Sequence, residues 1–178
     1  MIAHEGAHVA TCWIMGGRVT GVTLKSNADG QTDSIGPNGL GGIITSFVGY
    51  LGPSIFGLSA AVLIALDHIV AVLWLAVIFL TIILLLVRNS FGVISVILNG
   101  GIIFLVLRYG NAELQTITAY ALSWFMLFSG VRWVFAHNTG ASDAHNLRDA
   151  THIPRVVWFV LWLVATVTAL WVGGHLLV

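Results

Sequence analysis

Residues 69–87 read IVAVLWLAVIFLTIILLLV and contain no charged side chain. The run is about 19 residues long, and a helix that rises about 1.5 Å per residue needs about 20 apolar residues to cross a hydrocarbon core of about 30 Å. The segment therefore predicts a membrane-spanning helix. It decides the fold class because most of the chain repeats the same pattern.

Five further apolar segments occupy residues 2–15, 43–66, 90–108, 116–135 and 156–177. The whole chain is 58% hydrophobic and only 8% charged, whereas a soluble domain carries roughly 25% charged residues. So few charges cannot cover a water-exposed surface. We expect a single all-α domain over residues 1–178, a polytopic transmembrane bundle of about six helices in a lipid bilayer.

The first segment, 2–15, is the shortest, and about 14 residues are too few to span a bilayer. We expect this first helix to be N-terminally incomplete, with further residues upstream of Met1. The alternative is a short helix buried among the others.

The connection 16–42 predicts a small β-hairpin after the first helix. Residues 18–25 are rich in β-branched side chains, Asn27-Ala28-Asp29-Gly30 is a turn signal, and residues 31–35 can return as a second strand.

Charge defines the orientation of the bundle. The formal net charge is zero, so the sequence shows no basic footprint for nucleic acid. Most cations lie in or beside the connections 16–42, 88–89 and 136–155, which alternation places on one membrane side: Arg18, Lys25, Arg88, Arg132, Arg148 and Arg155. Positively charged loops favour the cytoplasm. We expect this side to be cytoplasmic in a multi-pass cell-membrane protein, with the C-terminus outside.

The first segment carries the motif His4-Glu5-Gly6-Ala7-His8. Histidines at i and i+4 share one helix face, so their Nε2 atoms can converge on one ion. Glu5 is placed to accept a proton from a water that the metal activates, the arrangement found in zinc hydrolases. The alternative is a hydrogen-bonded polar cluster between helices, but burying these groups without a cation is costly.

Catalytic zinc usually has three protein ligands, so a third must come from elsewhere. The polar run 137–152 lies on the membrane side where the first helix ends, and a loop that dips from there can reach His8. The candidate ligands in this run are His137, Asp143, His145 and Asp149. Chemistry alone barely separates them.

The sequence resembles the M50 (site-2 protease) membrane metallopeptidases, in particular their bacterial M50B-like branch. The motif His4–His8 followed by Gly16-Gly17-Arg18-Val19-Thr20-Gly21-Val22 is similar to the start of that family. Other matching elements are Gly49-Tyr50-Leu51-Gly52, Ser129-Gly130-Val131-Arg132, Ser142-Asp143-Ala144, Thr151, Ile153-Pro154 and Trp158. The chain departs from the family where Asn-Pro-Asp-Gly or Leu-Asp-Gly usually stands, since it reads Ala141-Ser142-Asp143-Ala144.

The resemblance implies a zinc metalloendopeptidase that hydrolyses a peptide bond in a membrane protein or peptide. It implies that Asp143 is the third zinc ligand beside His4 and His8, with His145 as the main rival. On this hypothesis Glu5 is the general base, and Asn138 or Asn146 hydrogen-bonds the oxyanion.

Three other functions use the same residues. An inactive membrane scaffold would keep zinc for stability, and a transporter would use the polar residues as a pathway. A transporter predicts paired repeats, and the sequence has no internal repeat. A hydrolase of lipid amides would have a similar site with a different access route.

Overall fold

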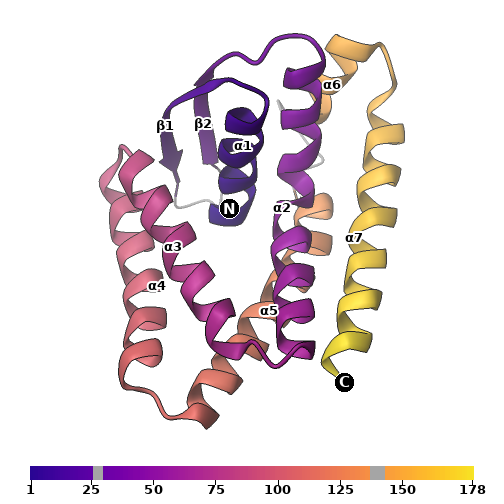
Figure 1. Ribbon diagram of the computed structural model, residues 1–178. Helices are drawn as coiled ribbons and strands as arrows, with labels where there is room; N and C mark the ends of the chain where they lie inside the picture. Colours follow the sequence, from indigo (N-terminus) through magenta and orange to yellow (C-terminus); the bar gives the residue numbers. More distant parts are fainter. Residues whose placement is uncertain (26–29, 137–142) are drawn as a thin grey trace.

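The computed structural model describes residues 1–25, 30–136 and 143–178. Within these residues the order is α1 (Ile2–Ile14), β1 (Arg18–Leu24), β2 (Gly30–Ile35), α2 (Leu40–Ala65), α3 (Ile69–Leu86), α4 (Ser90–Tyr109), α5 (Ala112–Ala136), α6 (Asp143–Thr151) and α7 (Arg155–Leu177) (Figure 1). Helices α2, α3, α4, α5 and α7 are long and apolar enough to cross a membrane. The predicted multi-pass bundle with a hairpin after its first helix is confirmed.

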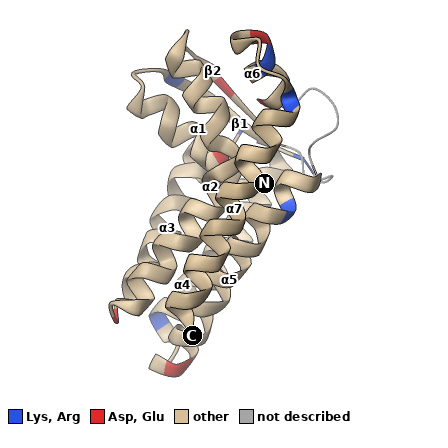
Figure 2. Cartoon of the chain, turned by 90° about the vertical axis from the view of Figure 1, so that its right-hand side faces the viewer, with Lys and Arg blue, Asp and Glu red and all other residues tan. Residues whose placement is uncertain are grey.

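The spanning helices form two groups. Helices α2, α5 and α7 pack on one another, and α3 pairs with α4 while also contacting α5. The stretches of α3, α4 and α7 between their ends carry no charged residue, and charges gather toward the ends of the bundle (Figure 2). Such helices satisfy their own backbone hydrogen bonds and can face lipid. Which end faces the cytoplasm stays a prediction.

Helix α2 is the centre of the packing, and small residues let its neighbours approach. A Cβ added at Gly57 would lie 2.8 Å from the backbone nitrogen of Leu127 in α5. The buried Ser123 hydroxyl of α5 donates a 2.9 Å hydrogen bond to the Gly57 carbonyl. Close backbone approach and interhelical hydrogen bonds are the usual ways to join helices in lipid.

The hairpin has one closed edge and one open edge. Strands β1 and β2 pair antiparallel, with Val22 opposite Thr32. On the other side of β1, the Arg88 amide donates to the Val22 carbonyl at 2.9 Å. The Asn89 side chain accepts from the Leu24 amide at 3.1 Å and donates to the Leu24 carbonyl at 2.6 Å. In the described part of the chain, no strand pairs with the outer side of β2.

The polar run after α5 differs from the expected loop, because Asp143–Thr151 form the helix α6. Ala144 and Leu147 are three residues apart and both buried, so the helix has an apolar side. Asp143 lies in the first turn of α6, where the helix dipole stabilises a carboxylate. Residues 137–142, which include His137 and Asn138, lie outside the described residues.

Candidate metal centre

Helix α1 is a buried helix with two polar sides. It contacts α2 on one side and the hairpin on another. His4, Glu5 and His8 are only 7%, 3% and 9% exposed. At 3.6 residues per turn, His4 and His8 lie about 40° apart around the helix, and Glu5 lies about 100° from His4. That α1 belongs to a longer first helix stays a prediction.

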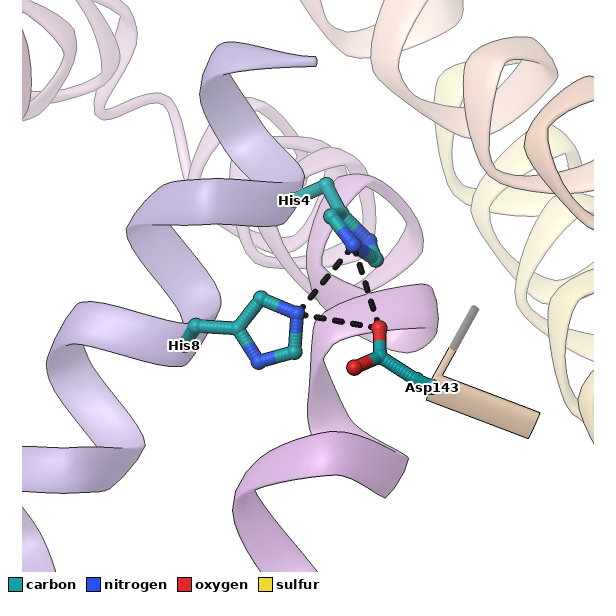
Figure 3. A group of neighbouring side chains, drawn as sticks. All are labelled: His4, His8 and Asp143. Carbon is teal, nitrogen blue, oxygen red and sulfur yellow. Dashed lines mark hydrogen bonds and ion pairs between the residues drawn. The ribbon is translucent and has the colours of Figure 1, made fainter. Parts of the chain in front are cut away.

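Two side chains of α1 and one from far along the chain converge at the start of α6. His4 Nε2 lies 3.1 Å from His8 Nε2, and Asp143 Oδ2 lies 3.1 Å from His8 Nε2 and 3.3 Å from His4 Nε2 (Figure 3). Within residues 1–25, 30–136 and 143–178, these three form a group of ligand-type side chains able to hold a metal ion.

The ring of His8 is oriented by a hydrogen bond at the nitrogen that faces away from the cluster. Its Nδ1 lies 2.9 Å from the carbonyl oxygen of Thr45 in α2, so the N–H at Nδ1 donates to that carbonyl. In the neutral tautomer this leaves the Nε2 lone pair directed at the cluster, the usual outer-shell arrangement of a metal-ligating histidine. A Cβ at Gly49 would collide with the His8 ring. Gly49 therefore makes room for the imidazole against α2.

Aromatic rings enclose His4. Its ring centroid lies 5.1 Å from that of Tyr50 and 5.1 Å from that of Trp133. Tyr50 stacks on Trp162 at 4.0 Å, and the Trp162 indole donates to the Phe47 carbonyl at 2.9 Å. In the part of the chain described, the buried His4 Nδ1 has no hydrogen-bond partner. The ring is thus held by packing, with Nε2 turned to the cluster.

The donor set fits zinc. Burial alone would raise the pKa of the Asp143 carboxyl, but hydrogen bonds with His4 and His8 and the charges of these rings hold that pKa well below its usual value. Two imidazole nitrogens and a carboxylate oxygen within 3.3 Å of one another need a cation between them, a proton or a metal ion. Two histidines and one carboxylate are a common ligand set of catalytic zinc.

Glu5 points to the hairpin side of α1. The Thr32 hydroxyl of β2 donates a 2.7 Å hydrogen bond to Glu5 Oε2. A Cβ at Gly30, also in β2, would collide with the same carboxylate. The carboxylate is therefore fixed by the strand whose outer edge is open. Sequence reasoning missed Thr32 and Thr45, because neither contact follows from residue spacing.

The other predicted site residues that the structure describes are not part of this group. His145 Nε2 lies 3.3 Å from Asp149 Oδ2 on α6, and Arg148 also pairs with Asp149 at 2.7 Å. Hydrogen bonding to Arg148 lowers the pKa of the Asp149 carboxyl. Asn146 is exposed on α6. Asn138 lies outside the described residues.

The described residues define a class of protein, a multi-pass helical membrane protein with a buried two-histidine, one-carboxylate cluster on a His-Glu-x-x-His helix. The family comparison then identifies it. The Peptidase M50B-like family model matches residues 1–173, and the chain belongs to this family. Among curated proteins and among solved structures, no match was found. The family indicates a peptidase, and the individual residue roles stay predictions.

Proposed function

We propose that this chain is an intramembrane zinc metalloprotease that hydrolyses a peptide bond of a membrane-embedded substrate. The observation that carries the proposal is the convergence of His4, His8 and Asp143, with the buried Glu5 next to His4 in the sequence of α1. Membership in the M50B-like peptidases supports the same chemistry. The side with more Lys and Arg supports an active site near the cytoplasmic side.

His4, His8 and Asp143 would hold Zn²⁺ through Nε2, Nε2 and Oδ2. When bound, zinc supplies Lewis-acid chemistry, since it makes a water molecule more acidic and polarises a carbonyl group. Thr45 keeps the His8 tautomer that leaves Nε2 unprotonated. The apolar and aromatic surroundings of His4 limit water and strengthen the electrostatic interactions in the site.

Glu5 moves the proton. Its carboxylate accepts a proton from the attacking water as the new carbon–oxygen bond forms, and it delivers that proton to the nitrogen as the carbon–nitrogen bond breaks. The products are a carboxylic acid and an amine. The hydrogen bond from the Thr32 hydroxyl to Oε2 fixes the rotamer of the Glu5 side chain.

The open edge of β2 suits an extended substrate. A transmembrane helix must unwind before its backbone is accessible, and its freed N–H and C=O groups then need partners. Strand addition to β2 supplies them. Because Thr32 of β2 contacts Glu5, a peptide on this strand would lie on the side of α1 that carries the base.

The test uses the purified chain in proteoliposomes with a library of single-span transmembrane peptides. Products are identified by mass spectrometry, and zinc is counted by elemental mass spectrometry. We expect one zinc per chain and cleavage of some peptides. Glu5→Gln should keep zinc and lower turnover by at least about 10²-fold, the smallest usual contribution of a general base.

Three outcomes would contradict separate parts of the proposal. Zinc without cleavage in the wild type would indicate an inactive zinc-binding scaffold. Undiminished cleavage in Glu5→Gln would remove Glu5 as the base. A wild type without zinc would refute the metal centre.

A further inference from the structure

A groove lies between α5 and α7, formed by residues outside the metal cluster. Its volume is about 390 Å³, and its lining residues are Phe125, Phe128, Ser129, Val131, Arg132 and Leu170. Phe125 and Phe128 are 63% and 56% exposed. The groove therefore opens on the outer surface of the bundle, where lipid contacts the spanning helices.

The lining residues are ordered along one helix face. Phe128 and Ser129 lie three and four residues after Phe125, and Arg132 lies four and three residues after them, so the four residues form a stripe along α5. The lower part of the stripe is apolar, and Leu170 of α7 also lines the groove. The upper part carries the Ser129 hydroxyl and the Arg132 guanidinium one turn apart.

Ser129 and Arg132 have polar side chains that no other described side chain pairs with. In residues 1–25, 30–136 and 143–178, neither the Arg132 guanidinium nor the Ser129 hydroxyl makes a hydrogen bond or an ion pair. An unpaired charge beside a lipid-facing groove is costly, and such groups in membrane proteins usually bind something. Both groups donate hydrogen bonds, and a guanidinium binds phosphate oxygens in a bidentate manner.

The depths of the residues match the parts of a phospholipid. Arg132 is one turn before the end of α5 at Ala136, hence about 6 Å from that end, and Phe125 lies about 10 Å deeper along the axis. We propose that the groove binds one phospholipid with an anionic headgroup. Its phosphate lies on Arg132 and Ser129, and one acyl chain follows Phe128, Phe125 and Leu170.

The lipid explains both halves of the groove. A free phosphate would contact Arg132 and leave the apolar half uncovered, whereas a phospholipid covers both. A net negative headgroup complements the single cation better than a zwitterionic one. The volume lies within the range of small-molecule sites, about 300–1,000 Å³. This site is independent of the proposed proteolysis.

The test is native mass spectrometry of the full chain in detergent, titrated with phosphatidylglycerol or with phosphatidylcholine of the same acyl chains. We expect the wild type to retain phosphatidylglycerol in preference to phosphatidylcholine. Arg132→Ala should weaken this binding about tenfold or more, because charge-assisted hydrogen bonds are lost. Arg132→Lys keeps the charge and loses the bidentate geometry. Its affinity for phosphatidylglycerol should lie between those of the wild type and Arg132→Ala.

Two variants control the interpretation. Arg108→Ala removes a cation that is exposed beside Tyr109 in the last turn of α4, and it should leave lipid binding unchanged. Leu170→Trp fills the groove without changing charge and should also weaken binding. Equal weakening by Arg132→Ala and Arg108→Ala would overturn the site, as would unchanged binding in Leu170→Trp. Inorganic phosphate is added as a competitor. If it displaces the bound lipid as effectively as free phospholipid does, the groove is a simple anion site and the proposal is overturned.

Discussion

The two sides of α1 are built differently. On the side of α2, His8 is hydrogen-bonded to Thr45 and packed on Gly49, inside the central packing of long helices. On the other side, Glu5 is held by Thr32 from a two-stranded hairpin with an open edge. The proposed ligands thus stand on closely packed helices, while the proposed base depends on a small sheet. Metal affinity and proton transfer should therefore respond to different substitutions.

The largest expected effect is on the α2 side. His8→Ala removes one of three proposed ligands, so we expect zinc content to fall from one per chain to nearly none, with loss of cleavage. Elemental mass spectrometry of the purified protein measures this. His175→Ala, an exposed histidine of α7, is the control and should keep zinc. Full zinc content in His8→Ala would contradict the ligand assignment.

A smaller effect on the same side comes from Gly49→Ala. The added Cβ would displace the His8 ring, and disturbance of a ligand's support typically lowers metal affinity by about 10–100-fold. Competition with a zinc chelator measures the affinity. Gly101→Ala is the control, because a Cβ there meets no atom within 4 Å. Equal affinities for the two variants would show that α2 does not support the ligand.

On the hairpin side, Thr32→Val should slow cleavage and spare zinc. It removes the 2.7 Å hydrogen bond to Glu5, so we expect turnover to fall about tenfold, with an unchanged zinc stoichiometry. Turnover in proteoliposomes and zinc content are measured on the same sample. Thr32→Ser keeps the hydroxyl and should restore most of the rate. A loss of zinc in Thr32→Val would remove the distinction between the two sides.

The smallest effect is expected at the closed edge of the hairpin. Asn89→Ala removes both side-chain hydrogen bonds to Leu24, which should lower stability by about 1–2 kcal/mol and leave zinc content unchanged. Thermal unfolding in detergent measures the change. Asn99→Ala, whose side chain among the described residues bonds to Ser95 of its own helix, should have a smaller effect. If Asn89→Ala unfolds no earlier than this control, the hairpin does not depend on the clamp.

The sequence predicted the fold well because long apolar runs leave few alternatives in lipid. Residues 69–87 and the other spanning segments follow from length and composition, and the hairpin follows from its turn residues. Helix α6 was missed, since a mostly polar helix of nine residues is too short to show a clear period and depends on Ala144 and Leu147 being buried by other helices.

The candidate site could be predicted in part. The i, i+4 spacing placed His4 and His8 on one face, because that geometry is local to a helix. Asp143 needed the family resemblance, since chemistry did not separate it from His145. Thr45 and Thr32 were beyond prediction, because their contacts depend on how α2 and the hairpin pack against α1.

The open edge of β2 also carries a hazard. A row of unpaired backbone groups can template the strand of another copy as readily as that of a substrate, which is how edge strands start aggregation. Two features of β2 oppose this. The strand is only six residues long, and the exposed Asp33, bonded to Gln31, places a negative charge along it. Copies of the chain would meet like charges there, so the edge that we propose to admit a peptide also discourages self-association.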